Sequence, residues 1–206
     1  MVRFSAQDKA RITGAIHQAE KGTSGEFVAV VARASDHYIF VPLLWSALIS
    51  LLIPGACLLL EAPLRWVQLY QIQLLTFIVL SVLLLSIPGL HLKLVPARVK
   101  HARASRLAKA QFYQQGVQLT PHHSGVLFFV SLAERYVEIV ADKGIHEKLG
   151  EARWQGIIEL FVGKVSRGRV VDGFVEAIGA CGAAMAEHYP PDPGVTDELS
   201  DGLIEL

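Results

Sequence analysis

The pattern of hydrophobic and polar positions divides the chain into three parts. Between residues 37 and 92 the only formal charges are Glu61 and Arg65, whereas both flanks mix charged and apolar residues as water-soluble domains do. Residues 39–60 and 69–92 are almost continuously apolar. Each run has the roughly 20 residues that a helix needs to cross the hydrocarbon core of a bilayer.

The two interrupting charges indicate a turn at a water interface. A charged residue at mid-membrane costs about 2.5 to 3.5 kcal/mol on insertion scales. Pro63 favours a turn, and Trp66 and Tyr70 follow where amphipathic aromatic side chains anchor a helix end. Residues 37–93 are therefore predicted to form a two-helix transmembrane hairpin with its tip at 61–65. The alternative is a helical hairpin buried in a soluble core, but the rest of the chain is too short to cover it.

A basic stretch follows the second apolar run, and it contains no acid. Its charged residues are Lys93, Arg98, Lys100, Arg103, Arg106 and Lys109. The positive-inside rule places this stretch, and with it both termini, in the cytoplasm. The stretch would suit anionic lipid or, alternatively, nucleic acid. Because it lies beside a membrane helix, we favour lipid and expect no nucleic-acid partner.

The two flanks together predict one domain that the hairpin interrupts. Residues 5–22 place apolar side chains at helical spacing, with Ser5 as N-cap and Asp8 three residues later in a capping box. The stretch 25–35, "GEFVAVVARAS", is apolar on both faces, as expected of a strand that helices cover.

The elements expected after the hairpin are a basic helix, two antiparallel strands and two helices, at residues 97–115, 125–132, 135–142, 151–168 and 169–190. A crossover would make the first two strands of the chain parallel. The order predicts an α/β fold, a three-layer α/β/α sandwich with a small mixed sheet. Residues 1–36 and 94–190 would form the domain. Residues 191–206 carry five acids and no base, which favours a mobile tail.

Composition adds mainly exclusions. Basic and acidic residues number 19 each, so the overall charge favours neither nucleic acid nor an acidic partner. Cys57 and Cys181 lie far apart, without metal-ligand spacing or a disulfide framework. The N-terminus has no apolar segment of the kind found in signal peptides, so no cleavable signal peptide is expected.

Two stretches, "TSGEFVAVV" and "GVLFFVSLAERYVEIVADKGI", followed by a helix that bears Trp154, resemble the TPM domain family. That family includes a thylakoid-lumen protein of photosystem repair, bacterial membrane proteins and an accessory protein of animal acetylcholine receptors. The resemblance implies a mixed sheet between helices, in a bacterial branch where a membrane hairpin interrupts the domain. Acid phosphatase activity and divalent-cation binding have been proposed for some members, and others look like non-enzymatic accessory proteins.

The order of strands brings candidate ligands together. Glu26 and Asp142 would share the membrane-distal end of the sheet and could hold Ca²⁺ or Mg²⁺, which prefer oxygen ligands. Alternatively both are solvated or capping residues, with Asp142 at the start of a short helix near Gly144. His122 and His123 would lie at the same end, either solvated or as transition-metal ligands.

Catalytic residues are not assigned. Glu134 and Arg135 are expected in a polar turn at the membrane-facing end, and Ser124 and Ser131 lack a motif that supplies a base. No phosphate-cradling, zinc-protease or dinucleotide motif is present. The expected function is a non-enzymatic interaction or accessory module that is held at the cell inner membrane and binds a partner protein. The alternatives are a weak metal-assisted acid phosphatase and a lipid-responsive protein.

Overall fold

The computed structural model describes residues 4–61, 63–87, 89–120, 123–192, 199 and 202–206. The chain divides into two units, Met1–Ser35 with His101–Leu206 and Asp36–Lys100. The first unit joins the two sequence flanks, and the second contains the apolar hairpin.

A four-stranded mixed sheet forms the centre of the first unit. β1 (Glu26–Ala32) lies parallel to β2 (Gly125–Ser131), and β2 pairs with β3 (Tyr136–Ala141) in the antiparallel sense. β4 (Ile204–Glu205) runs parallel to β1 on its other side, giving the order β3-β2-β1-β4. Strands on either side of the hairpin insertion are therefore neighbours in one sheet, as predicted.

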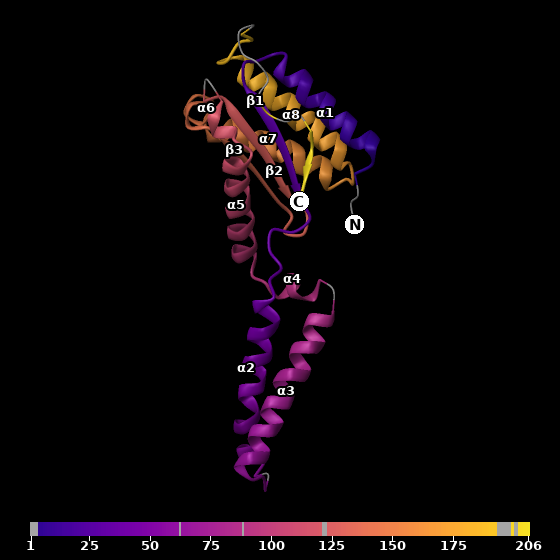
Figure 1. Ribbon diagram of the computed structural model, residues 1–206, viewed down its shortest axis with the longest axis vertical. Coiled ribbons are helices and arrows are strands. Elements are labelled where there is room, and N and C mark those ends of the chain that lie inside the picture. The colour runs from indigo at the N-terminus through magenta and orange to yellow at the C-terminus, as the bar shows by residue number, and fades with distance from the viewer. Residues whose placement is uncertain (1–3, 62, 88, 121–122, 193–198, 200–201) are drawn as a thin grey trace. The chain divides into compact units, whose positions relative to one another are not determined.

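Helices cover both faces of this sheet, so the predicted three-layer sandwich is confirmed (Figure 1). One layer contains α1 (Ala6–Glu20), α6 (Lys143–Leu149), α7 (Glu151–Val165) and α8 (Val170–Ala186). The opposite layer contains α5 (Ala97–Gln114) and the 3₁₀ helix η1 (Val117–Leu119).

The two cores explain why β1 is apolar at every position after its first residue. Phe27, Ala29 and Val31 face the α1, α7 and α8 layer. Val28, Val30 and Ala32 pack instead with α5. In the larger core the rings of Phe128, Phe161 and Phe174 meet edge to face, with centroids 5.0 to 5.5 Å apart. Such aromatic pairs add to the free energy gained by burial.

The start of α1 confirms the predicted capping box. The Asp8 amide donates to Ser5 Oγ at 3.1 Å, and the Ser5 amide donates to Asp8 Oδ2 at 2.9 Å. The hydrogen bonds from Ser5 lower the pKa of the Asp8 carboxyl.

The end of the chain differs from the predicted mobile tail. The Leu206 amide donates to the Val31 carbonyl at 2.9 Å, and the Arg33 amide donates to the Leu206 carbonyl at 3.0 Å. The chain end binds here for two reasons. The free edge of β1 offers backbone groups that need hydrogen-bond partners, and the apolar Ile204 packs against the core between the sheet and α5. Residues 193–198, 200 and 201 of this stretch lie outside the described part.

The second unit contains two long helices side by side, α2 (Phe40–Leu59) and α3 (Trp66–Ser86), followed by the short helix α4 (Leu90–Leu94) (Figure 1). The second long helix ends six residues earlier than predicted. Ile87 is extended, with ψ of 107°, because the residue before a proline is disfavoured in the helical region.

At the base of the hairpin, Tyr38 is fully buried and packs with Val41 and Val95. Its amide donates to Asp36 Oδ1 at 3.1 Å. This small core lies within the second unit.

Candidate functional site

The first candidate site is the sheet end where β1 and β2 begin and β3 finishes. Glu26 pairs in register with Gly125, and the Asp142 amide donates to the Gly125 carbonyl at 3.1 Å. Glu26 and Asp142 therefore lie at one end of the sheet, as the strand order predicted. His123 lies beside them in the same loop region, whereas His122 is outside the described residues.

Asp142 already has partners at this end. Its Oδ1 accepts from the Lys143 amide at 2.6 Å, at the start of α6, and its Oδ2 lies 3.2 Å from His123 Nδ1. The side chain of Asp142 is 15 % exposed, so solvent reaches it. Asp142 stands directly before α6, and its backbone carbonyl accepts from the Ile145 amide at 3.1 Å.

Glu26 lies deeper, and the loops around it are tightly tied. Its amide donates to the Ser124 carbonyl at 3.2 Å, and Thr23 Oγ1 donates to the Tyr189 carbonyl at 2.6 Å. A Cβ on Gly25 would lie 3.0 Å from the Ser124 carbonyl oxygen, a backbone atom, and 1.9 Å from Met185 Cε, the movable end of a flexible side chain. The glycine in "TSGEFVAVV" thus has a packing role.

The metal-binding role of Glu26 and Asp142 stays a prediction. Ca²⁺ takes six to eight oxygen ligands. In the described part of the chain, no three His, Cys, Asp or Glu side chains form a group that could hold a metal ion. Any cation at this end would therefore need backbone oxygens and water besides the two carboxylates.

The opposite end of the sheet contains a polar cluster formed by the buried Ser131 and Glu134 with the half-buried Ser35. Glu134 Oε1 accepts from the Ser35 amide at 3.0 Å, and Glu134 Oε2 accepts from Ser131 Oγ. The two serine hydroxyls lie 2.8 Å apart. Glu134 is only 4 % exposed, so it ties the β2–β3 turn to the chain as it leaves β1.

Glu134 and Arg135 lie in the polar turn between β2 and β3 that the sequence predicts, but Glu134 is buried in it. The turn forms without glycine because Arg135 adopts the left-handed conformation, with φ of 52°. The spacing of three residues between Ser131 and Glu134 was the available sequence signal. Ser131 is fully buried and held by Glu134, so it has no access to a substrate.

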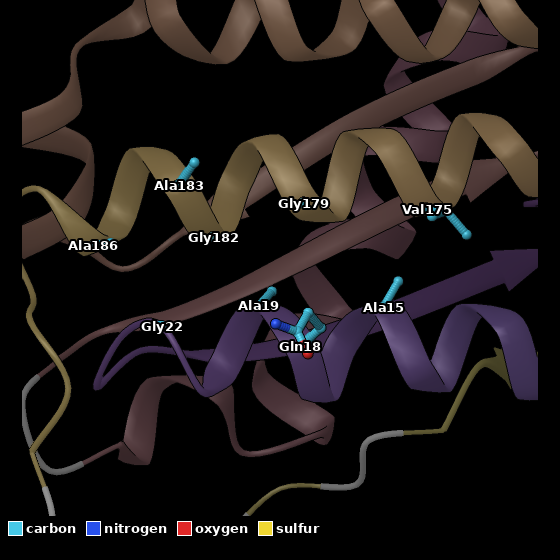
Figure 2. Close-up of a pocket in the computed structure, with 9 residues that line it drawn as sticks. All are labelled: Ala15, Gln18, Ala19, Gly22, Val175, Gly179, Gly182, Ala183 and Ala186. Atoms are coloured by element: carbon cyan, nitrogen blue, oxygen red, sulfur yellow. The ribbon is translucent and has the colours of Figure 1, made fainter.

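A groove between α1 and α8 is the second candidate (Figure 2). It encloses about 330 Å³ and is lined mainly by small residues, with Gln18 as the polar one. Gly182 allows the close approach, because a Cβ there would lie 2.8 Å from Ala19 Cβ. The groove therefore results from tight helix packing and presents no acid, base or nucleophile.

A separate cavity, of about 530 Å³, lies beside Tyr189. It is lined by Ser24, Lys148, His188 and Asp192, with two prolines. Lys148 Nζ lies 4.2 Å from the centre of the Tyr189 ring, a cation–π contact. Cys181 offers no nucleophile, because burial raises the pKa of its thiol to about 12.

The third feature is the apolar surface of α2 and α3. Both helices are long and apolar enough to cross a membrane. Of the most apolar 18-residue stretch in each helix, only 22 % is buried in α2 and 6 % in α3. Among the described residues, all but five of the exposed large apolar side chains lie between Ile39 and Ile87. Core helices of a soluble protein would be covered within the chain, whereas these two are exposed along most of their length.

Comparison with known proteins agrees with this fold. The family model described as TPM domain matches residues 94–184. Among solved structures, the NMR structure of the BA42 protein from the psychrophilic bacterium Bizionia argentinensis is similar, with a TM-score of 0.63 and 18 % sequence identity. The similarity covers 99 % of this chain and 96 % of that chain, and it concerns the fold alone. No curated protein matches the sequence.

Proposed function

We propose that this chain, which carries a TPM domain, is an integral protein of the cell inner membrane whose domain faces the cytoplasm. There it acts as a non-enzymatic accessory module that binds a partner protein. One observation supports this proposal above the others. An uncovered apolar hairpin, α2 and α3, is inserted between β1 and α5 of the domain.

The energetics of the hairpin support insertion. Neither α2 nor α3 contains a charged residue. On insertion scales each Leu, Ile, Phe or Val at the centre of a helix contributes about −0.3 to −0.6 kcal/mol. In water, the same side chains would remain exposed, which favours aggregation or a large hydrophobic partner.

The fold supports placing both flanks on one side of the membrane. β1 precedes the hairpin and β2 follows it, yet the two strands pair along their full length. The basic stretch after the hairpin then favours the cytoplasmic side, since the tip carries one Arg and one Glu.

Copurification and assay of the intact protein test the function. Tagged protein extracted from membranes in mild detergent should retain one partner in a fixed ratio, and it should release no phosphate from varied phosphomonoesters with Mg²⁺, Ca²⁺ or Mn²⁺. Phosphate release that Asp142→Asn abolishes would contradict the non-enzymatic function. It would support the phosphatase alternative.

Cation binding at Glu26 and Asp142 is a separate part of the proposal. Thermal unfolding followed with and without Ca²⁺ or Mg²⁺ measures it, because a ligand that binds only the folded state raises the melting temperature. We expect a rise that Asp142→Asn removes and Glu147→Gln keeps. The same rise in the Asp142 variant would exclude this site.

A further inference from the structure

We infer that the exposed face of α5 docks onto anionic phospholipid headgroups of the membrane that holds the hairpin. We call this face the α5 surface and define it by Ala102, Arg106, Lys109 and Tyr113. The inference rests on the proposed insertion of α2 and α3, and it adds a second membrane contact made by the TPM domain itself.

Helix geometry separates the α5 surface from the core. Ala104, Ala108 and Phe112 pack against the sheet. At 100° per residue the members of the α5 surface lie on the opposite side of the helix. All four are exposed. The α5 surface is thus the polar side of an amphipathic helix whose apolar side is already buried.

The charges of the α5 surface lack the acidic partners that bases have on the helices of the opposite layer. On the other layer, α1, α7 and α8 match bases with acids, as in Arg11 with Asp172 at 2.7 Å and Lys164 with Glu176. α5 contains no acid. Among the described residues Arg106 and Lys109 have no ion pair.

Glu138, on β3, is an acid that contacts α5. It is partly buried, and it accepts hydrogen bonds from Ser105 at 3.2 Å and from Tyr136 at 3.1 Å. Ser105 lies on the side of α5 nearer the sheet, and it is less exposed than Arg106. Glu138 therefore leaves the positive field of the α5 surface facing solvent.

Exposed apolar side chains lie at the end of the same helix. Tyr113 is 66 % exposed and Leu119, in η1, is 74 % exposed. They are two of the five large apolar side chains that are exposed outside Ile39–Ile87 in the described chain. Bases beside an amphipathic aromatic ring suit the headgroup layer, where Tyr and Trp concentrate and basic residues meet anionic lipid. The proposed contact requires α5 to lie along the membrane surface, and it therefore replaces the expectation that the sheet end beside Glu26 is membrane-distal.

Chain connectivity favours lipid over nucleic acid as the occupant. α3 ends at Ser86 and α5 begins at Ala97. Even a fully extended chain between these two residues would span roughly 40 Å at most. An inserted hairpin thus holds the α5 surface at a high effective concentration relative to headgroups. Each Lys or Arg near an anionic membrane surface contributes about 1 kcal/mol to binding, which strengthens the contact about fivefold.

The test uses the full chain in lipid nanodiscs, with a fluorophore at Ala102→Cys in a Cys57→Ala background. Discs contain phosphatidylcholine alone or with equal parts phosphatidylglycerol, plus a headgroup-bound quencher. We expect stronger quenching with phosphatidylglycerol, and loss of the difference in high salt, because ions screen exposed charges. Arg106→Gln/Lys109→Gln should weaken the contact about 30-fold, at about fivefold per base removed, and Arg106→Glu/Lys109→Glu should weaken it further.

The matched control is Lys21→Glu/Arg167→Glu, which reverses two exposed bases outside α5. It should quench as the parent does, and equal melting temperatures of the three double variants exclude unfolding. Equal quenching in both lipids, with the hairpin retained in the discs, would overturn the lipid contact alone. A protein that is not retained in discs would overturn membrane insertion, and displacement of the lipid contact by RNA would favour nucleic acid.

Discussion

Gly125 shows how one residue controls the junction between η1 and the sheet. A Cβ at this position would lie 2.2 Å from the Val117 carbonyl oxygen, a backbone atom that cannot rotate away. We expect Gly125→Ala to lower the free energy of unfolding by about 3 kcal/mol, the upper range of overpacking costs. Denaturant unfolding in detergent measures this change.

Gly14 supplies the control for that substitution. It lies in α1, and a Cβ added there would meet no atom within 4 Å outside its chain neighbours and its own helix backbone. Gly14→Ala should raise the free energy of unfolding by about 0.5 to 1 kcal/mol, because alanine is the better helix former. If both substitutions had the same effect, close approach of η1 would not be the reason for Gly125.

Glu134 is the buried acid on which the second residue-scale prediction depends. Its carboxylate accepts from the Ser35 amide and from Ser131 Oγ. Glu134→Ala leaves the Ser35 amide without its acceptor and Ser131 Oγ with Ser35 Oγ as a remaining partner, so we expect a loss of about 1 to 3 kcal/mol of unfolding free energy. Glu147→Ala should change it by less than about 0.5 kcal/mol, because Glu147 is exposed and its ion pair with Lys143 is long, at 3.8 Å. A loss no larger than the Glu147 control would show that the cluster contributes little.

Cys181 gives a prediction about reactivity. Its thiol is buried in the larger core and its pKa is raised to about 12, so at pH 8 roughly one thiol in ten thousand is ionised. In a Cys57→Ala background, maleimide should label the folded protein slowly and the unfolded protein fully. Rapid labelling of the folded protein would place Cys181 at the surface.

At the scale of elements, apolar periodicity was sufficient where packing is local. The capping box at Ser5 and Asp8 and the apolar faces of α7 and α8 follow from side-chain chemistry and helical spacing. Two features did not follow. β4 forms because the end of the chain meets the open edge of β1, and the Glu134 cluster needs Ser35, which is distant in sequence. Both depend on tertiary contacts that no local pattern specifies.

The two long helices give the element-scale prediction. Leu75 lies near the middle of α3 and is exposed, whereas Val67 lies in its first turn. Leu75→Arg should cost about 3 kcal/mol of insertion and shift protein from the carbonate-resistant membrane fraction, because the charge falls at mid-membrane. Val67→Arg should stay in that fraction, since a charge near the interface is cheap. Equal extraction of the two variants would contradict a spanning α3.

At the scale of the whole molecule, one sheet links the two sequence flanks. β1 and β2 pair from Glu26 with Gly125 to Ala32 with Ser131, although the whole hairpin separates them in sequence. The flanks must therefore reach the same compartment before this sheet can form. A hairpin that crosses the bilayer twice satisfies that requirement, and a single crossing does not.

Accessibility of the hairpin tip in intact cells tests this topology most directly. Glu61→Cys and, separately, Lys109→Cys are made in a Cys57→Ala background and exposed to a membrane-impermeant maleimide before and after lysis. We expect the residue at position 61 to react in intact cells and the residue at position 109 only after lysis. Reaction of both positions only after lysis, or of both in intact cells, would contradict a membrane hairpin that returns the chain to one cytoplasmic domain.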